Sequence, residues 1–478
     1  MLENYQVEHN SQNIYYRSIV GAAEAGGRIR LGIRIRTQER IHQVLVRLWQ
    51  DRTGEYLIPL ETKDTQGEQY FYTCWAKLPD YGCLVWYYFI ITTDSGTYFY
   101  GNNEERLGGI GALSQEAPPS YQITIYNKGA RTPDWFKNAV MYQIFPDRFA
   151  RAGDTIVRKK GAVIRTDWTD DPMYLKDPDT KEIIAYDFFG GNLRGIISKL
   201  DYLQELGISC IYFNPVFESE SNHHYDTGDY HKIDPVLGNI EDFRDLVTQA
   251  GERGIRIILD GVFSHTGSNS IYFNRRQQYS SLGAYQSKES PYYSWYHFRN
   301  YPNEYDCWWD FDTLPNVNET DPAYMDFVIT GENSVLHHWM NEGIAGWRLD
   351  VIDELPPTFS KTFFAELKKR DPEAVMIGEV WEDASNKVAY GTPREYLSGN
   401  EMDSAMNYPL RTILFDFLTG HADGRQTMRR QCSQLENYPK ENLYAMMNLI
   451  GSHDVQRAIT VLAGVPYYEG MPAIEQSR

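Results

Sequence analysis

The alternation of apolar and polar residues changes character once along this chain. From the N-terminus to residue 128, short β-branched and aromatic runs alternate with polar positions, as in strands with one buried face. Turn sequences such as Asp51-Arg52-Thr53-Gly54 separate these runs. Their spacing predicts a β-sandwich of immunoglobulin-like size over residues 1–128. The predicted strands are Ile29–Arg36, Val44–Trp49, Tyr70–Trp75, Val85–Thr92 and Tyr121–Tyr126.

After residue 129, strand-like runs alternate with amphipathic helical segments, a rhythm typical of a parallel sheet. Seven strands are predicted, at 140–146, 208–215, 255–261, 346–351, 375–381, 404–408 and 444–450. Helices are predicted at 193–206, 240–253, 322–341, 356–369 and 409–418. The rhythm predicts a (β/α)8 barrel of the TIM type over residues 129–478, with its active site at the C-terminal ends of the strands.

Two segments depart from the regular rhythm. An aromatic insertion, about residues 264–318, follows the third strand, and loops of that length inside a compact domain are usually functional. After Ser452-His453-Asp454 only 24 residues remain. Gly464-Val465-Pro466-Tyr467-Tyr468 is too close to the seventh strand for a crossover helix to fit between them. We therefore expect the eighth strand and a C-terminal β-domain to be missing from this chain, or the barrel to close in a non-standard way.

Composition narrows the class of protein. A chain of 478 residues exceeds one ordinary core. A net charge of -19 disfavours nucleic acid and anionic membranes as partners, because both would repel it. The five cysteines have no CxxC spacing, and the N-terminus shows no basic region followed by an apolar one. These features predict reduced thiols and a cytoplasmic protein, although a secreted protein trimmed of its signal peptide would look the same.

Charged residues gather at four predicted strand ends. Alternation along the strand at 346–351 places Arg348 and Asp350 on one face. Each polar group taken alone could be a structural ion pair, and an isolated Arg-x-Asp is more often a surface salt bridge. Their shared position at one end of a barrel favours catalysis. The groups are Asp260 with His265, Arg348 with Asp350, Glu379, and His453 with Asp454.

The carboxylates in this set suit two different roles. A neighbouring Arg348 should lower the pKa of Asp350 and keep it ionised, as a nucleophile requires. Glu379 has no cation adjacent in sequence and is followed by Val380 and Trp381. We therefore expect Glu379 to hold a proton. A nucleophile and an acid from different strands are the pair that retaining glycoside hydrolysis uses.

Four segments resemble the signature sequences of the α-amylase family (glycoside hydrolase family 13), in the same order. The segments are Asp260-Gly-Val-Phe-Ser-His265, Gly346-Trp-Arg-Leu-Asp350, Gly378-Glu-Val-Trp381 and Ser452-His-Asp454. Met141-Tyr-Gln-Ile-Phe-Pro-Asp-Arg-Phe149, Thr313-Leu-Pro-Asn-Val-Asn318 and the N-terminal sandwich are similar to the neopullulanase, cyclomaltodextrinase and maltogenic amylase branch. The likeness covers Pro133 to Asp454 in sequence, and residues 1–128 only in architecture, where it implies a carbohydrate-binding-like domain.

The resemblance implies a role for each residue. Asp350 would be the nucleophile, Glu379 the general acid and base, and Asp454 the third carboxylate, which stabilises the transition state. Asp260 would orient Arg348, and Trp381 would shape the acceptor subsite. Residues that would bind the sugar at the cleavage point are Arg348, His265, His453 and Tyr225. In the insertion, Trp295, Trp308 and Trp309 either cover the cleft or form the insertion's own core.

The resemblance also implies a substrate and a partner. The expected substrates are maltodextrin-, pullulan- or cyclodextrin-type α-glucans, cleaved at α-1,4 and perhaps α-1,6 bonds with retention, with transglycosylation as a side reaction. The alternative is a catalytically weak α-glucan-binding protein on the same fold. A homodimer through the N-terminal domain is an open expectation. The branch commonly has an Asn/Asp-rich calcium run after Phe149, but Arg158-Lys159-Lys160 stands near it here. We predict no metal and no cofactor, and calcium has only weak support.

Overall fold

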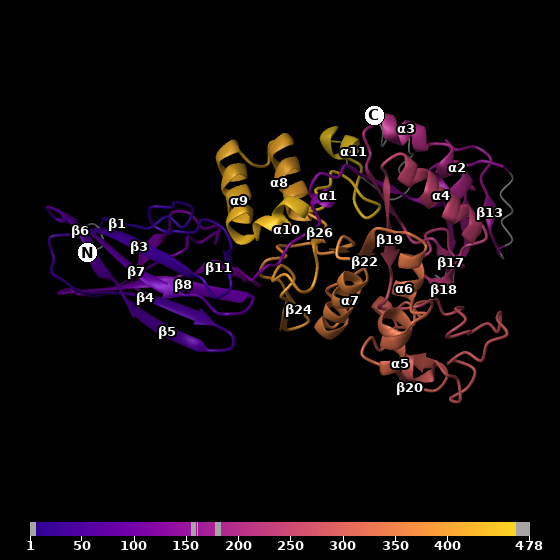
Figure 1. The fold of residues 1–478 in the computed structure, drawn as a ribbon, viewed down its shortest axis with the longest axis horizontal. Helices are drawn as coiled ribbons and strands as arrows, with labels where there is room; N and C mark the ends of the chain where they lie inside the picture. The colour runs from indigo at the N-terminus through magenta and orange to yellow at the C-terminus, as the bar shows by residue number, and fades with distance from the viewer. Residues whose placement is uncertain (1–5, 154–158, 160, 177–182, 465–478) are drawn as a thin grey trace. The chain divides into compact units, whose positions relative to one another are not determined.

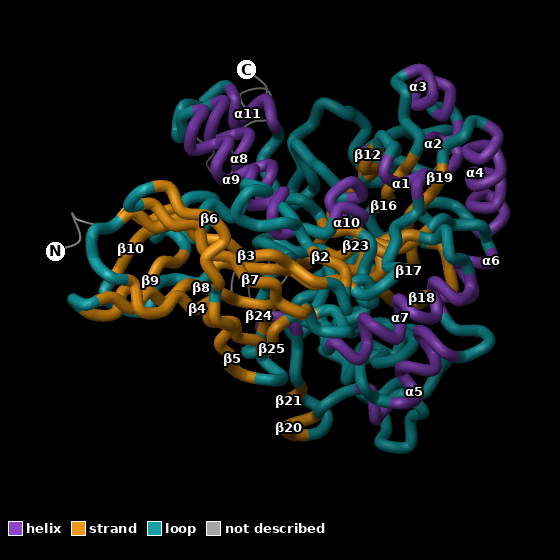
Figure 2. The backbone as a smooth tube through the Cα atoms, turned by 60° about the vertical axis from the view of Figure 1, so that its left-hand side comes forward, coloured by secondary structure: helices purple, strands orange, loops and turns teal. Residues whose placement is uncertain are grey.

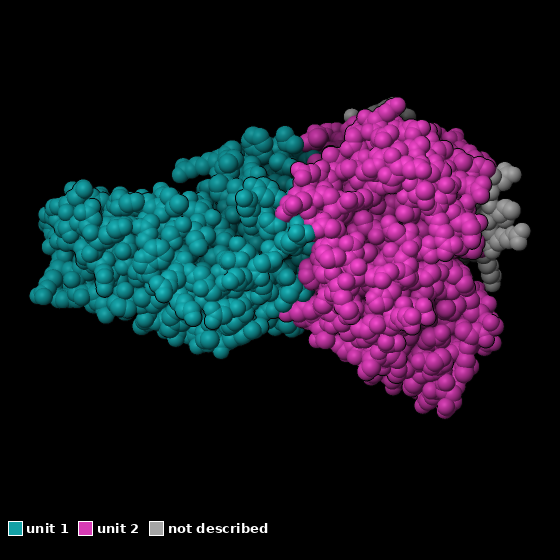
Figure 3. Space-filling model, viewed as in Figure 1, with its two compact units in different colours: residues 1–132, 381–403, 407–448 teal, residues 133–380, 404–406, 449–478 magenta. Residues whose placement is uncertain are grey.

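The structure is a computed structural model that describes residues 6–153, 159, 161–176 and 183–464 (Figure 1). The chain folds into two compact units, coloured separately in Figure 3. Unit 1 contains residues 1–132, 381–403 and 407–448, and unit 2 contains residues 133–380, 404–406 and 449–478. The segment after the fifth predicted strand therefore belongs to the unit that holds the N-terminal strands.

Two sheets form the N-terminal part of unit 1, and their pairings are antiparallel except for that of β11 with β2. In the first, the order is β1 (Gln6–Glu8), β3 (Arg28–Arg36), β7 (Gln69–Lys77), β6 (Glu61–Gln66). In the second, the order is β10 (Ala112–Ser114), β9 (Gly96–Gly101), β8 (Cys83–Thr93), β11 (Tyr121–Tyr126), β2 (Ala23–Glu24). β4 (Ile41–Gln50) pairs with β8 and with β5 (Gly54–Pro59). All five strands predicted in this region are present.

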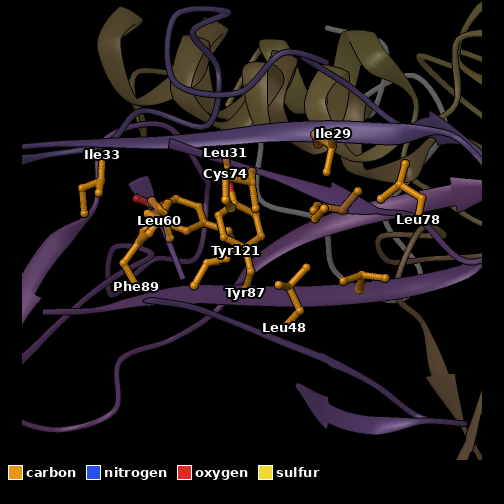
Figure 4. Packing of buried hydrophobic residues seen from close by; sticks show 14 of the residues in the cluster. Ile29, Leu31, Ile33, Leu48, Leu60, Cys74, Leu78, Tyr87, Phe89 and Tyr121 are labelled. Atoms are coloured by element: carbon orange, nitrogen blue, oxygen red, sulfur yellow. The ribbon is translucent and has the colours of Figure 1, made fainter. Parts of the chain in front are cut away.

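The alternation along β3 explains how the sandwich closes. Ile29, Leu31, Ile33 and Ile35 are fully buried, while the arginines between them lie on the outer face. In Figure 4 the apolar side chains of β3 point toward Leu48, Tyr87 and Phe89 of the opposite sheet. Burying these side chains removes apolar surface from water on both sheets, the main favourable contribution to folding.

The remainder of unit 1 is mainly helical. It contains β24 (Val388–Ala389), β25 (Thr392–Pro393), α8 (Tyr408–Leu418), α9 (Gly424–Asn437) and α10 (Lys440–Ala445). A buried ion pair joins α9 to the sandwich: Arg17 Nη1 lies 2.8 Å from Glu436 Oε1, and both side chains are almost fully excluded from solvent. The arginine also donates hydrogen bonds to the carbonyl oxygens of Gln122 and Gly21. These contacts make the helices and the sandwich one packed unit.

Unit 2 is built on a parallel sheet of six strands, counted over the described residues. They run in chain order from one edge to the other, and every pairing is parallel. Such an order agrees with consecutive βα units of a barrel wall. The strands are β12 (Met141–Ile144), β16 (Cys210–Phe213), β19 (Arg256–Gly261), β22 (Gly346–Leu349), β23 (Val375–Gly378) and β26 (Ser404–Ala405).

Helices connect these strands, as Figure 2 shows in purple against the orange strands. α4 (Ile240–Glu252) begins at a capping box in which Asn239 and Asp242 satisfy each other's backbone N–H groups. The other helices of unit 2 outside the insertion are α1 (Asp134–Lys137), η2 (Pro146–Arg148), α2 (Leu193–Ile197), α3 (Leu200–Glu205), α5 (Pro322–Met325), η5 (Asp326–Thr330), α6 (Val335–Asn341), α7 (Pro357–Arg370) and α11 (Ala458–Leu462), counted over the described residues. None of the helices within the described ranges is long and apolar enough to cross a membrane.

The loops of unit 2 contain several small sheets of two or three strands. The predicted insertion lies between β19 and β22 and contains η3 (Tyr293–Trp295), β20 (Phe298–Asn300), β21 (Glu304–Tyr305) and η4 (Trp308–Asp310). Elsewhere lie β13 (Val163–Ile164), β14 (Tyr174–Lys176), β15 (Ile183–Phe188), β17 (Phe217–Ser219) and β18 (Thr227–Ile233).

Three sequence predictions need correction or fall outside the described ranges. The seventh strand at 444–450 is not formed as predicted: Tyr444 lies in α10, which begins after Pro439, and of residues 446–450 only Met447 makes a β-bridge, its carbonyl oxygen accepting from the Asn407 N–H at 2.9 Å. The single helices predicted at 193–206 and 322–341 are broken, the second by a π-helical turn and a bend after Thr330. Most of the segment in which an eighth strand was sought, residues 465–478, lies outside the described residues.

Candidate active site

Three neighbouring strands place the predicted charged residues side by side. In the parallel register Asp260 of β19 is level with Arg348 of β22, and Leu349 is level with Gly378, immediately before Glu379. The strands approach closely at Gly346, where a Cβ atom would lie 2.1 Å from the carbonyl oxygen of Val375. Only glycine fits at that position.

Arg348 is the centre of this cluster. Its Nη1 donates to Asp260 Oδ1 at 2.9 Å and to Asp350 Oδ1 at 2.6 Å. Its Nη2 lies 2.9 Å from Glu379 Oε2. The guanidinium is fully buried, and all three carboxylates are at most 10% exposed. One buried cation is therefore shared by three buried carboxylates drawn from three strands.

The shared cation changes two expectations about charge. Burial raises the pKa of the Asp350 carboxyl well above its usual range; Arg348 opposes this rise, and Glu379 and Asp260 add to it. The expectation that Arg348 holds the pKa of Asp350 low is wrong, because a single guanidinium cannot offset three carboxylates and their desolvation. No cation is adjacent to Glu379 in sequence, but Arg348 reaches it in space across the β22–β23 pairing.

The backbone beside Asp350 is strained. Val351 has a φ of 39°, a left-handed conformation that a β-branched residue rarely adopts. In this conformation its N–H donates to Glu379 Oε2 at 2.8 Å. Such strain costs about 1–3 kcal/mol and is commonly found at functional sites. The turn thus links Glu379, which directly follows β23, to Val351, the residue after Asp350.

A closed ring of hydrogen bonds holds Tyr225 and His453. Gln143 Nε2 contacts Asn214 Oδ1 at 2.9 Å and His453 Nδ1 at 2.7 Å. The Tyr225 hydroxyl accepts from Asn214 Nδ2 at 3.1 Å and lies 2.7 Å from His453 Nε2. The same hydroxyl donates to Asp260 Oδ2 at 2.8 Å. The rings of Tyr225 and His453 are stacked, with centroids 5.4 Å apart.

The directions of these hydrogen bonds fix the histidine tautomer. Asp260 is held by Arg348 and accepts the Tyr225 proton, so the tyrosine oxygen must accept from His453 Nε2–H. Nδ1 then carries the lone pair and accepts from Gln143. Burial lowers the pKa of His453 to about 4, so the imidazole is neutral at neutral pH.

Removing the Gln143 amide should therefore impair the site without removing a charge. We expect Gln143→Leu to lower kcat/KM roughly ten- to a hundred-fold, because it leaves the buried Nδ1 lone pair of His453 without a donor, which costs about 1–3 kcal/mol. Gln143→Glu should raise the pKa of His453 from about 4, since a carboxylate favours the imidazolium. Nitrogen-15 shifts of labelled histidine report the tautomer and the pKa of His453. A wild-type His453 protonated at Nδ1 and not at Nε2 would contradict the assignment.

Gln143 and Asn214 were missed in the sequence, although a signal was present. Gln143 is a lone polar residue inside an apolar strand, and Asn214 directly follows the second strand. Both lie on the wall where a barrel site is expected. Tyr212 was also missed; its hydroxyl donates to Asp260 at 2.5 Å.

The other predicted residues occupy different surroundings. His265 is buried: Ser264 Oγ lies 2.9 Å from its Nδ1, and the Tyr225 carbonyl accepts from its Nε2 at 3.2 Å. Burial lowers the pKa of His265 to about 4. Asp454 Oδ1 lies 3.3 Å from His453 Nε2. Trp381 belongs to unit 1, where it is 45% exposed and stacks on Tyr408 with centroids 4.0 Å apart.

Metal binding finds little support in the described residues. Over these ranges, no group of three or more His, Cys, Asp or Glu side chains could hold a metal ion. Of the basic run near the expected calcium segment, only Lys159 is described, and its Nζ lies 2.5 Å from Asp234 Oδ2. An ammonium group at that carboxylate opposes a divalent cation there. All five cysteines are free thiols.

Comparison with known sequences identifies the class of protein. The alpha amylase catalytic domain matches residues 143–469. The chain therefore belongs to the alpha-amylase family, and the predicted resemblance is confirmed.

Named relatives refine this assignment. The chain is 36% identical to an amylopullulanase of Thermoanaerobacterium saccharolyticum over 95% of its own length and 38% of the relative's. It is 34% identical to neopullulanase 2 of Thermoactinomyces vulgaris, over 70% of this chain and 53% of that protein. A solved cyclomaltodextrinase superposes with a TM-score of 0.60 at 27% identity, covering 97% of this chain and 74% of that one. The chain spans about two-fifths to half of the length of the first two relatives.

Proposed function

We propose that this chain is a retaining α-glucan hydrolase. The observation that carries the proposal is the shared arginine, which brings Asp350 to 2.6 Å and Glu379 to 2.9 Å of one guanidinium at the ends of adjacent strands. Two carboxyl groups so close to one cation suit a nucleophile and an acid acting on one glycosidic bond. Membership of the alpha-amylase family and relatives named for pullulan and cyclomaltodextrin point to α-glucans as substrates.

The proposed reaction begins with a proton on Glu379. Burial raises the pKa of Asp350, which shares Arg348 with Glu379; the proposed reaction needs Asp350 ionised and a proton on Glu379. Glu379 then protonates the departing glycosidic oxygen while an Asp350 oxygen attacks the anomeric carbon, forming a glycosyl ester. In the second half, Glu379 takes a proton from water, which attacks the same carbon and releases Asp350. A sugar hydroxyl in place of water gives transglycosylation.

Other residues of the site are proposed to position the sugar. We propose that Tyr225 stacks beneath the sugar at the cleavage point and that Arg348, His265 and His453 contribute to binding that sugar. Asp454, beside His453, supplies the third carboxylate that stabilises positive charge in the transition state. Trp381 is assigned to the acceptor subsite.

New reducing ends provide the direct test. The full chain is mixed with maltoheptaose or pullulan, and reducing sugar is measured over time; we expect linear release. Saturable binding without turnover would support the α-glucan-binding alternative instead. On pullulan, panose, isopanose and maltotriose report different cleaved bonds, so the product profile distinguishes α-1,4 from α-1,6 cleavage.

The domain, partner and localisation assignments accompany this proposal. Residues 1–128 would form a carbohydrate-binding-like domain and residues 129–478 the catalytic domain, with the insertion at 264–318. A homodimer through the N-terminal domain and a cytoplasmic location are part of the same proposal. The five unpaired cysteines support a reducing compartment.

A further inference from the structure

The insertion between β19 and β22 exposes aromatic rings to solvent. Trp309 is 72% exposed and Phe311 56% exposed, whereas Trp295 of the same insertion is 2% exposed. Trp295 packs against Tyr272 and Tyr324 and is a core residue. Core packing therefore accounts for Trp295 but not for Trp309 or Phe311. Neighbouring exposed rings on an otherwise polar surface commonly mark a binding site.

The backbone at the exposed Trp309 adopts a strained conformation. Trp309 has φ 49° and ψ 38°, and Asp310 has a φ of 62°. Consecutive left-handed residues other than glycine are uncommon, and such strain persists where the surroundings impose it. Trp309 Nε1 donates to Glu354 Oε1 at 3.0 Å. Glu354 lies four residues after Asp350, so the exposed ring is tied to the loop that follows the proposed nucleophile.

A row of rings connects Trp309 with the candidate active site. Trp308 lies over His265, with centroids 5.4 Å apart and an interplanar angle of 34°. Trp308 is then 5.6 Å from Trp309, and stacks at 23° on Phe311. His265 in turn donates to the Tyr225 carbonyl. The exposed rings are thus linked, through Trp308 and the buried His265, to Tyr225 of the candidate active site.

We propose that Trp309 and Phe311 form an additional subsite that binds a glucosyl residue of the α-glucan chain beyond the sugar held at His265. Flat aromatic rings suit the apolar faces of glucose, and the rigid two-torsion side chains lose little entropy on binding. The position one ring further out than Trp308 makes this a subsite for longer chains. The inference rests on the proposed function and specifies which substrates that site prefers.

Chain-length preference tests the subsite. For Trp309→Ala, the ratio of kcat/KM for maltoheptaose to kcat/KM for maltotriose should fall about five- to ten-fold, the loss expected for one ring contact. Trp75→Ala is the matched control, because Trp75 is 60% exposed on β7 in the other unit. Trp309→Phe keeps the ring but loses the N–H to Glu354, and should retain most of the preference. An unchanged ratio in Trp309→Ala would overturn the proposal.

Calorimetric binding separates the subsite from the proposed hydrolysis. Maltoheptaose affinity is measured in the wild type, Trp309→Ala and Trp75→Ala, with sedimentation of each protein. A weaker affinity in Trp309→Ala alone supports the subsite, even if the wild type shows no turnover. An absence of turnover in the wild type contradicts the proposed hydrolysis and leaves the subsite result valid. Equal affinities in all three proteins would overturn the subsite, and a change confined to the oligomeric state of Trp309→Ala would show that a second copy, not a glucan, covers these rings.

Discussion

Asp350→Asn and Glu379→Gln should each lower kcat on α-glucans by several orders of magnitude, while the fold is retained. Asp350→Asn removes the proposed nucleophile, and Glu379→Gln removes the group proposed to deliver a proton to the leaving oxygen. Single removals of such residues in other hydrolases cost roughly 10⁴- to 10⁶-fold. Both substitutions keep side-chain volume and reduce charge around Arg348, so circular dichroism should show an unchanged fold.

The two variants should differ on an activated substrate. An α-glucosyl fluoride has a leaving group that needs no proton, so Glu379→Gln should recover much of its rate for the first step, and Asp350→Asn should not. Rates of fluoride release measure this step directly. Near-full activity of Glu379→Gln on maltoheptaose would show that another residue is the acid. Recovery of both variants on the fluoride would argue against the separate roles.

Glu436→Gln should lower the free energy of unfolding by about 3–5 kcal/mol, the typical cost of leaving one partner of a buried ion pair without the other. Arg17 is fully buried, and its neighbours Gln122 and Gly21 contribute only neutral carbonyl groups. Without Glu436 its charge has no counter-ion at 2.8 Å. Denaturant unfolding monitored by fluorescence measures the loss.

Two further variants show whether charge or packing is responsible. The exposed pair Arg47–Glu55 of the same unit is the control, and Glu55→Gln should cost below about 1 kcal/mol. In the double variant Arg17→Met/Glu436→Leu, apolar side chains replace both charges, and stability should recover toward that of the wild type. A double variant no more stable than Glu436→Gln would show that geometry, not the unpaired charge, dominates.

The local periodicity of the sequence predicted much of the fold and part of the site. The two-residue alternation of β3 and β22 sets which face each side chain takes, because a strand needs no distant contact to impose it. For that reason Arg348 and Asp350 could be placed on one face from sequence, and they lie 2.6 Å apart. The failed prediction at 444–450 shows the limit of this reasoning: a short apolar run does not distinguish a strand from a buried helix end.

The chemical groups of the site and the strand ends on which they lie follow from residue types and local pattern. Tertiary structure alone decided how those groups share charge and protons. Glu379 meets Arg348 only through the pairing of β22 with β23, and Gln143 meets His453 across 310 residues of chain. Exposure likewise separated Trp309 from Trp295, which are indistinguishable by residue type. Long-range contacts and desolvation depend on the whole packed molecule, so no local pattern of residues encodes them.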